Sequence, residues 1–301
     1  MPKKIIYDCD NTLGLFGKDV DDGLTLAYLA AQPDIEPLGI TTTFGNGTLE
    51  EVRAQTNWLV ADLDLEDVPL HHGEAQRGQG PTEAAEFLAE TAAAHPGEVT
   101  ILATGPLGNL RAAQSLDAAF YRNVQSVVCM GGYLQPLRLG RRDLPELNLS
   151  ADPEATVGLL QAAARGEVEM VLMNAQVCLQ AAFGPREMWR SRRWRQPYRR
   201  AVGLWLTAFG LHCGIRFFYL WDLLPAVYVT HPELFDAQRA RIGMNLADLE
   251  KGSLRTDPEA GAEIVMPSAI RDIERFKQLL FDAWQAQLGP AIETLSKRNR
   301  E

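Results

Sequence analysis

Short apolar runs alternate along this chain with longer segments of helical periodicity. The runs have the length and composition of strands that are buried on both faces of a parallel sheet. We expect such strands at Lys4–Tyr7, Pro37–Thr42, Val99–Thr104, Val124–Met130 and Glu169–Asn174. We expect helices at Gly23–Ala31, Leu49–Ala61, Thr82–Ala94, Gly108–Leu116 and Pro153–Ala164. This alternation predicts an α/β fold, a doubly wound and mostly parallel sheet flanked by helices, in one domain over residues 1–301.

The last third of the chain has a different pattern. Residues Arg186–Leu224 are predicted to be mostly helical, and a final helix is expected near Ala269–Leu288. The longest apolar stretch, Ala201–Trp221, is interrupted by His212 and Arg216. We therefore interpret it as a buried helix and not as a membrane span, which needs about 20 predominantly apolar residues. Near the start of the chain, a Thr at position 48 with a Glu three residues later predicts a capping box for the second helix.

Composition narrows the range of functions. The 301 residues include 29 Lys and Arg, 39 Asp and Glu and 46% hydrophobic residues, and the formal net charge is −10. Such a chain can bury a large core, and its acidic balance argues against a nucleic acid polymer as partner. The N-terminus has no signal-peptide pattern, and we expect a cytoplasmic protein without a membrane partner. Buried free thiols are expected for the scattered cysteines Cys9, Cys129, Cys178 and Cys213.

The segment Arg186–Arg200 is rich in arginine, with Trp189, Trp194 and Tyr198 among the arginines. Such a run can form a patch that binds phosphate or nucleic acid. A solvated helix face or an oligomer contact is much commoner, and the overall negative charge favours that interpretation.

Acidic residues cluster at the end of the first predicted strand. Asp8 and Asp10 follow the first apolar run, and Asp19, Asp21 and Asp22 lead into the first helix. The carboxyl end of a strand is where α/β sheets place their ligand sites. Crowded carboxylates repel one another unless a cation neutralises them, and a set of oxygen ligands suits Ca²⁺ or Mg²⁺. The pattern therefore predicts a metal site.

A phosphatase motif is one alternative for this cluster. Asp8, Asp10 and Thr12 form the pattern Asp-x-Asp-x-Thr after an apolar strand. This is similar to the nucleophile motif of the haloacid dehalogenase-like phosphatases, in which the first Asp attacks phosphorus with Mg²⁺ bound. That class also needs an acidic pair after a later strand. The sequence has no convincing pair there, so the phosphatase is the less favoured alternative.

Other predicted strand ends carry short polar motifs. They are Thr41–Asn46, Ala103–Leu110, Met130–Gly132, Pro145–Asn148, Ala151–Ala155 and Leu220–Asp222. In this order on one α/β chain, they resemble the inosine–uridine preferring nucleoside hydrolases, a family of calcium-dependent N-ribohydrolases. The resemblance is weaker in the final third of the chain. It implies hydrolysis of the N-glycosidic bond of a ribonucleoside to free base and ribose.

The resemblance also implies roles for individual residues. It implies four Ca²⁺ ligands, the carboxylates of Asp10, Asp22 and Asp222 and the backbone carbonyl of Thr104. Asp10 would also be the base that activates water. It implies ribose contacts for Asp21, Asn46, Glu146 and Asn148. Carboxylates and amides of this kind stabilise an oxocarbenium-like transition state. An N-cap before the apolar helix is the less favoured alternative for Asp222, given the Trp that precedes it.

Two departures from the family pattern concern the first loop and the base. The segment Asn11–Val20 is longer than the family's connection at this place, and we expect the loop to lie over the pocket. It leaves Asp19 as a rival to Asp21. Trp221 stands where pyrimidine-tolerant members have a His that protonates the leaving base. A Trp there resembles the purine-preferring branch, which relies on aromatic stacking, and Trp cannot act as an acid.

Two more departures concern the sugar end. The segment Leu139–Arg142 replaces the family's Gly-Asn contact to the 5′-hydroxyl, and Gln176–Cys178 replaces its Asp-x-Thr. Both changes put unmodified ribonucleosides in question as substrates. Arg141 or Arg142 is a candidate contact for a 5′-substituent such as a phosphate, although arginines at a surface are the commoner explanation.

We expect a Ca²⁺-dependent hydrolase of small nucleosides that prefers purines and forms a homodimer or homotetramer. Three alternatives remain open. The substrate is a modified or 5′-substituted nucleoside, the protein binds a ribosyl ligand without turnover, or the chain is the Mg²⁺ phosphatase described above.

Overall fold

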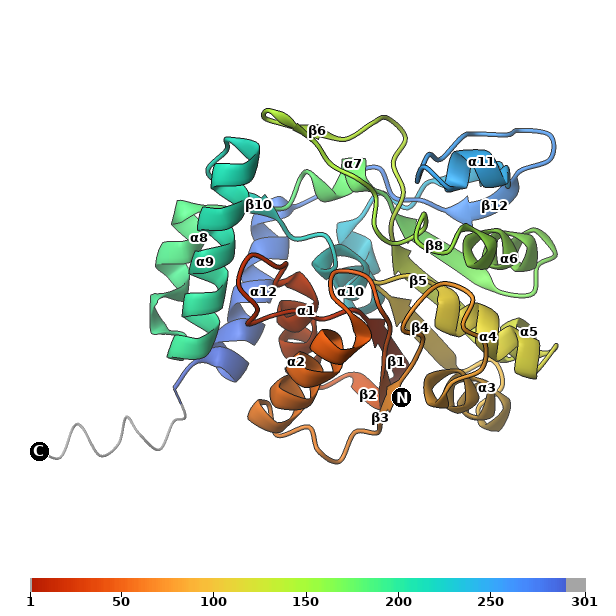
Figure 1. Ribbon diagram of the computed structural model, residues 1–301, viewed down its shortest axis with the longest axis horizontal. Coiled ribbons are helices and arrows are strands. Elements are labelled where there is room, and N and C mark those ends of the chain that lie inside the picture. The colour runs from red at the N-terminus through yellow and green to blue at the C-terminus, as the bar shows by residue number, and fades with distance from the viewer. Residues whose placement is uncertain (1, 291–301) are drawn as a thin grey trace, which may run out of the picture.

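The computed structural model describes residues 2–290, which form a central sheet between two layers of helices (Figure 1). The strands of this sheet are β1 (Lys3–Cys9), β2 (Ile35–Thr42), β3 (Leu70–His72), β4 (Val99–Ala103), β5 (Val124–Met130), β8 (Glu169–Met173), β11 (Arg239–Ile242) and β12 (Ala262–Val265). Two small separate sheets pair β6 (Arg138–Leu139) with β7 (Arg142–Asp143) and β9 (Ala182–Phe183) with β10 (Phe218–Tyr219).

The helices occupy most of the segments between strands. They are α1 (Asp21–Ala30), α2 (Leu49–Asp62), α3 (Glu83–Ala94), α4 (Gly108–Leu116), α5 (Phe120–Asn123), α6 (Pro153–Ala164), α7 (Ala175–Cys178), α8 (Pro185–Arg190), α9 (Gln196–Cys213), α10 (Leu223–Thr230), α11 (Leu246–Leu249) and α12 (Ile273–Leu288). Two 3₁₀ turns are η1 (Ser191–Arg193) and η2 (Pro232–Leu234).

The central sheet has eight strands in the order β11-β12-β8-β5-β4-β1-β2-β3. All neighbouring strands are parallel except β11, which pairs with β12 in the antiparallel direction. This confirms the predicted doubly wound, mostly parallel α/β fold. The carboxyl ends of β1, β2, β4, β5 and β8 lie along one edge, where the crossover connections leave room for a ligand.

Both faces of the sheet are buried. In β1, Ile5, Tyr7 and Cys9 belong to one apolar cluster and Ile6 belongs to the other, as the alternation of side chains along a strand requires. Helices α1, α2, α10 and α12 cover the first face, with α9 outside them, and α3, α4, α5, α6 and α11 cover the second (Figure 1). Because the central strands are covered on both sides, their sequences are continuous apolar runs.

The predicted strands and helices of the first half of the chain are all present, with ends that differ by a few residues. The capping box of α2 is confirmed. The Glu51 backbone N–H donates to the Thr48 hydroxyl (3.3 Å), and the Thr48 backbone N–H donates to the Glu51 carboxylate (2.9 Å). Strands β3, β11 and β12 were not predicted, because each is only three or four residues long and shows little apolar periodicity.

The prediction of one buried helix over Ala201–Trp221 is wrong. Helix α9 ends at Cys213, where Gly214 takes a left-handed conformation (φ 77°), and β10 follows. On α9, Leu211 is 70% exposed. The apolar residues of this stretch divide between core, a cavity and the surface, which a periodicity count cannot separate. No helix within residues 2–290 is long and apolar enough to cross a membrane.

The arginine-rich segment is only partly a solvated face. Arg192 and Arg193 are exposed, as interpreted from the sequence. By contrast, the Arg190 guanidinium lies 3.9 Å from the ring centre of Phe281, and Arg195 forms an ion pair with Asp62 at 2.9 Å. These contacts attach the end of α8 to α12 and the start of α9 to α2. The predicted free thiols are confirmed, and all four cysteines are buried.

Candidate active site

The carboxylate of Asp8 is fixed at the end of β1 beneath the site. It accepts hydrogen bonds from the Thr41 hydroxyl on β2 (2.6 Å) and from the Asn109 side-chain amide on α4 (2.7 Å). Burial raises the pKa of Asp8 to about 7. Its second oxygen has no hydrogen-bond partner within the described residues. Asp8 therefore connects three elements and does not line the cavity described below.

Asp10 and Asp22 lie just above it. The Asn46 backbone N–H donates to Asp10 Oδ2 (2.5 Å), and a Cβ at Gly45 would collide with that oxygen at 1.9 Å, so the close approach requires glycine. Asp22, in the first turn of α1, accepts bonds from the hydroxyls of Tyr7 (2.9 Å) and Thr104 (2.7 Å). Three strand ends and one helix thus orient two carboxylates.

Asp222 joins the group from the start of α10. Its side chain makes no capping hydrogen bond, so its explanation as an N-cap is wrong. Its backbone N–H donates to Asp21 Oδ2 at 3.2 Å, which connects α10 to α1. The structure therefore brings together all of the predicted metal ligands: Asp10, Asp22, Asp222 and Thr104.

These carboxylates repel one another. Burial and the charge of Asp22 raise the pKa of Asp10, and burial and the charge of Asp21 raise the pKa of Asp22 to about 6. Burial and the charges of all three raise the pKa of Asp222. Within residues 2–290, no Lys, Arg or His forms an ion pair with any of the four. An all-oxygen donor set with excess negative charge fits a hard divalent cation.

The cation-binding geometry is not complete in the side chains alone. No group of three His, Cys, Asp or Glu side chains in the described part of the chain has the arrangement of a finished metal site. The Thr104 carbonyl would be a further donor, and it accepts a hydrogen bond from the Asn148 side-chain amide (2.9 Å). A backbone donor and carboxylates in contact with one another fit a cation that takes oxygen ligands in flexible geometry.

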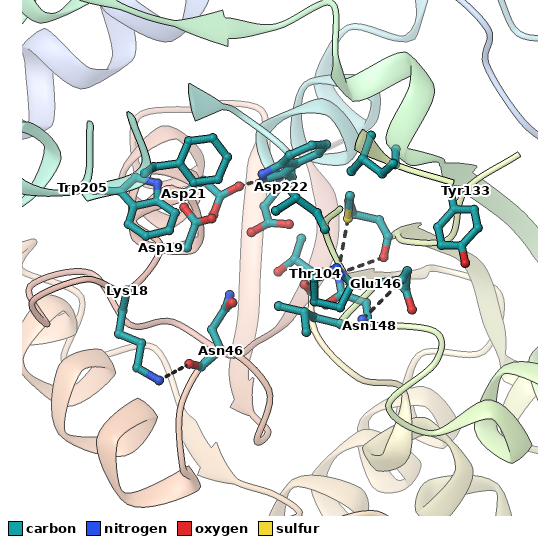
Figure 2. A pocket seen from close by; sticks show the side chains of 18 of the residues that line it. Lys18, Asp19, Asp21, Asn46, Thr104, Tyr133, Glu146, Asn148, Trp205 and Asp222 are labelled. Atoms are coloured by element: carbon teal, nitrogen blue, oxygen red, sulfur yellow. Dashed lines mark hydrogen bonds between the residues drawn. The ribbon is translucent and has the colours of Figure 1, made fainter. Parts of the chain in front are cut away.

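A cavity of about 520 Å³ opens above this cluster (Figure 2). Asp21, Thr104 and Asp222 line it, and we refer to these three as the floor. Trp205 and Phe209 of α9 form an aromatic wall, with Trp205 on the same side as Asp19 and Asp21 in Figure 2. An apolar wall consists of Tyr133, Leu137, Leu144, Pro145 and Leu147. Cavities of this size hold small organic ligands.

Glu146 and Asn148 line the cavity, as predicted, and both also hold its backbone in place. The Glu146 carboxylate accepts four backbone N–H groups, from Gly132 (3.1 Å), Asn148 (3.0 Å), Leu149 (2.9 Å) and Ser150 (2.6 Å). Three of these bonds go to Oε1 and one goes to Oε2, so Oε2 keeps an acceptor site. Glu146 is therefore an organiser of the loop after β7. Asn46 likewise lines the cavity while it holds Asp10.

The long Asn11–Val20 loop covers the cavity only in part. Its second half does so, because Gly17, Lys18 and Asp19 line the cavity. Lys18 Nζ donates to the Asn46 carbonyl at 2.7 Å (Figure 2). Its first half is anchored in the core through the buried Leu13. Asp19 and Asp21 both line the cavity, and their side chains lie next to each other.

The suggestion that Arg141 or Arg142 meets a 5′-substituent is not supported. Neither residue lines the cavity. The Arg141 guanidinium donates to the carbonyls of Leu211 and His212, and Arg142 Nε donates to the His212 carbonyl at 3.3 Å. These carbonyls are at the C-terminal end of α9, where cations stabilise the helix dipole. The two arginines therefore cap a helix.

Sequence reasoning missed the contribution of α9. Trp205, Ala208, Phe209 and His212 line the cavity at helical spacing. That spacing was visible in the sequence, although it is equally typical of a core-facing stripe. The role of Asn109 was also missed. Asn109 lies in the Ala103–Leu110 motif, and the sequence does not reveal that its amide donates to Asp8.

The sequence of most of the chain matches the model of a known protein family. The model described as inosine-uridine preferring nucleoside hydrolase matches residues 5–278. This chain belongs to that family. The nucleophilic phosphatase alternative is therefore wrong, which agrees with the enclosed position of Asp8.

Individual relatives of the family differ in the base that their names give. Uridine nucleosidase 1 of Arabidopsis thaliana is 30% identical over 182 residues, 51% of this chain and 52% of its own length. The chain thus spans about half the length of that curated relative. A plant nucleoside hydrolase, PpNRh1, has a TM-score of 0.82 at 21% identity, covering 95% of this chain and all of its own. A purine-preferring ribonucleoside hydrolase from Gardnerella vaginalis has a TM-score of 0.81 at 18% identity, covering 95% and 99%. At these identities the two structures support the fold of the family.

Proposed function

We propose that this nucleoside hydrolase is Ca²⁺-dependent and prefers purine ribonucleosides. The observation that supports the metal is the group of four buried carboxylates, Asp10, Asp21, Asp22 and Asp222, which no cationic side chain within the described residues neutralises. Asp10, Asp22, Asp222 and the Thr104 carbonyl would hold the ion. A bound Ca²⁺ supplies charge neutralisation and lowers the pKa of coordinated water.

The residues around Asp10 suit the role of a general base. The Asn46 backbone fixes one oxygen of Asp10 (2.5 Å), and the other oxygen accepts only a longer contact from the Asn46 side-chain amide (3.4 Å). Asp10 takes the proton of the attacking water as the water oxygen bonds to the anomeric carbon. Asp21 and Asn148 contact ribose hydroxyls and hold the sugar over the floor. Negative charge beneath the sugar stabilises the oxocarbenium-like transition state.

The aromatic wall supports the purine preference. Trp205 and Phe209 present aromatic surface to the cavity, with ring centres 5.2 Å apart, and Trp221 also lines it. Stacking favours the larger purine base over a pyrimidine. The relatives carry both specificities in their names, so the preference depends on these side chains and not on membership of the family.

A reducing-sugar assay tests the proposal. We expect faster ribose release from inosine than from uridine, loss of release after chelation, and recovery with Ca²⁺ but less with Mg²⁺. Equal rates with chelator present, or a faster reaction with uridine, would contradict the metal dependence or the base preference, respectively. Binding of inosine without turnover of any nucleoside would instead favour a ribosyl-ligand binding protein.

We also propose that the protein forms a homodimer or homotetramer, as the resemblance implies. Light scattering of the purified chain measures its mass directly. A mass near 33.3 kDa would contradict this proposal.

A further inference from the structure

The loop after β1 is held firmly against the cavity. The Thr12 hydroxyl donates to the Asp19 carbonyl at 3.0 Å, and the Leu15 backbone N–H donates to the Thr12 carbonyl at 3.0 Å. The buried Leu13 anchors the first half of the loop in the core. The loop therefore presents Lys18 and Asp19 to the cavity at a defined position.

Lys18 has N–H groups available for a ligand. Its ammonium donates to the Asn46 carbonyl at 2.7 Å (Figure 2), and an ammonium has three N–H donors. Lys18 is half-buried and forms no ion pair within residues 2–290. Glu51 of α2 is close enough for the two charges to interact, but its carboxylate is bound in the α2 capping box. Among the described residues, two donors of Lys18 thus remain without a partner.

Positive charge is scarce around the cavity. Of the described residues that line it, Lys18 is the only lysine or arginine. It lies with Asp19 and Trp205 on one side of the floor, the side of the aromatic wall (Figure 2). Burial and the charge of Asp21 raise the pKa of Asp19, which reduces the negative charge beside Lys18. Under the proposed function, the buried carboxylates lie beneath the sugar and the ammonium lies on the side of the base.

This division of charge matches the transition state of N-glycosidic cleavage. As the C–N bond breaks, positive charge develops on the sugar and the base takes the electron pair. Negative groups beneath the sugar and a positive group beside the base both lower the barrier, because they act on charge as it develops. The aromatic side chains Trp205, Phe209 and Trp221 supply neither that charge nor a proton. His212, in the last turn of α9, is the other candidate on this side, and it is exposed.

We propose that Lys18 is a catalytic residue that stabilises the departing base, with one of its N–H groups donating to an oxygen or ring nitrogen of the purine. This inference rests on the proposed nucleosidase function and assigns the leaving-group contact of the same site. Water oxygen bonds to the anomeric carbon, and its proton passes to Asp10. The C–N bond breaks, and its electron pair stays on the base beside the Lys18 charge. Lys18 keeps its proton, the base takes one up from the solvent, and Asp10 returns one to it.

The test compares two nucleosides whose bases leave differently. Guanosine releases a base that gains negative charge, whereas the ring of 7-methylguanosine is already positive and leaves as a neutral base. In Lys18→Met, kcat/KM for guanosine should fall about 10²-fold, the usual loss for one donor aimed at developing charge. The loss for 7-methylguanosine should be at least about tenfold smaller, because a cation beside a positive ring gives no stabilisation. Equal losses would show that Lys18 only positions Asn46, and no loss would overturn the proposal as well.

Three further variants link the effect to the charge of Lys18. Lys18→Arg keeps the charge and should recover most of the guanosine rate. Lys251→Met is the matched control, because Lys251 is exposed outside the cavity, and it should leave the ratio of the two substrates unchanged. His212→Gln should also leave this ratio unchanged. A selective loss of guanosine cleavage in His212→Gln, with none in Lys18→Met, would assign the leaving group to His212.

A binding measurement separates this inference from the proposed function. If neither nucleoside is cleaved, the nucleosidase proposal fails, and calorimetric titration with free hypoxanthine in the presence of Ca²⁺ still tests Lys18. At a pH at which hypoxanthine is an anion, the original chain should bind it about tenfold more tightly than Lys18→Met does, as a charge-assisted hydrogen bond implies. Neutral hypoxanthine should bind both proteins alike. Equal binding of the anion would contradict the role of Lys18, and cleavage of guanosine alongside that result would leave the nucleosidase proposal intact.

Discussion

The floor and the walls of the cavity differ in how the fold holds them. Asp21, Thr104 and Asp222 of the floor lie in front of Asp10 and Asp22. Hydrogen bonds fix this group between strand ends of the central sheet and the starts of α1 and α10. The walls come from α9 and from the segment around β6 and β7, which lie outside the central sheet (Figure 1). Under the proposed function, this difference means that the sheet positions the reaction and that peripheral segments select the substrate. Each of the following predictions tests this division.

The largest effect is expected at Asp10, directly behind the floor. Asp10→Asn removes the proposed base and keeps the shape, so kcat for inosine should fall about 10³-fold, within the range for general base catalysis. Binding of inosine, measured by calorimetry, should remain within a few-fold. Turnover within tenfold of the original chain would assign the proton transfer to another group.

Removal of a floor support should reduce stability. In Asn109→Ala, Asp8 loses a buried donor at 2.7 Å, which costs about 1–3 kcal/mol of unfolding free energy. Denaturant unfolding measures this loss. Asn57→Ala is the control, because Asn57 is exposed on α2 and bonds only within its own helix. Equal stabilities of the two variants would show that the floor does not depend on α4.

At the aromatic wall, the effect should be smaller and should depend on the base. Trp205→Leu removes a stacking surface, and kcat/KM for inosine should fall about tenfold, with a smaller loss for uridine. The matched control is Trp189→Leu, since Trp189 is exposed on α8 and outside the cavity. A loss of the same size for both bases would mean that Trp205 positions the floor.

The metal-free protein should have an unusual pH dependence. The pKa of Asp8 is raised to about 7 and that of Asp22 to about 6, both above the value near 4 of an unfolded chain. Stability from these groups is present at low pH and is lost as pH rises through the raised pKa values. With chelator present, the melting temperature should therefore be a few degrees higher at pH 5 than at pH 8. Added Ca²⁺ should restore stability at pH 8, and Asp8→Asn should weaken the pH dependence.

The smallest effect is expected at the tip of the long loop. Phe16 is 78% exposed. Phe16→Ser should change the free energy of unfolding by no more than about 0.5 kcal/mol and kcat/KM for inosine by no more than about twofold. The measurement is the same steady-state assay. A large rise in KM would show that this half of the loop closes over the bound substrate.

The strand ends could be predicted because the burial of a strand is visible in its own residues. A strand buried on both faces must be a continuous apolar run, so the end of β1 and the acidic residues after it were visible in the sequence. Neighbouring parallel strands then bring Asp10 and Thr104 to one edge. Asp222, far away in sequence, was assigned only through the family resemblance.

The walls were not predictable in the same way. The apolar residues of α9 are divided between core, cavity and surface, and periodicity does not distinguish these environments. Arg141 was considered for a phosphate because its partners, the carbonyls at the end of α9, are about seventy residues away in the chain. Glu146 was assigned to ribose, and its four backbone partners became visible only in the folded loop.

Arg141 and Arg142 connect the two walls of the cavity through hydrogen bonds. Arg141 and Arg142 follow β6, on the segment of the apolar wall, and they hold the last carbonyls of the helix that carries the aromatic wall. We therefore expect a displacement of one wall to affect the other. Substitutions that adapt the enzyme to a new base and to a new 5′-group should be non-additive, because the positions share these contacts. An evolving lineage would then acquire the two specificities together and not one after the other.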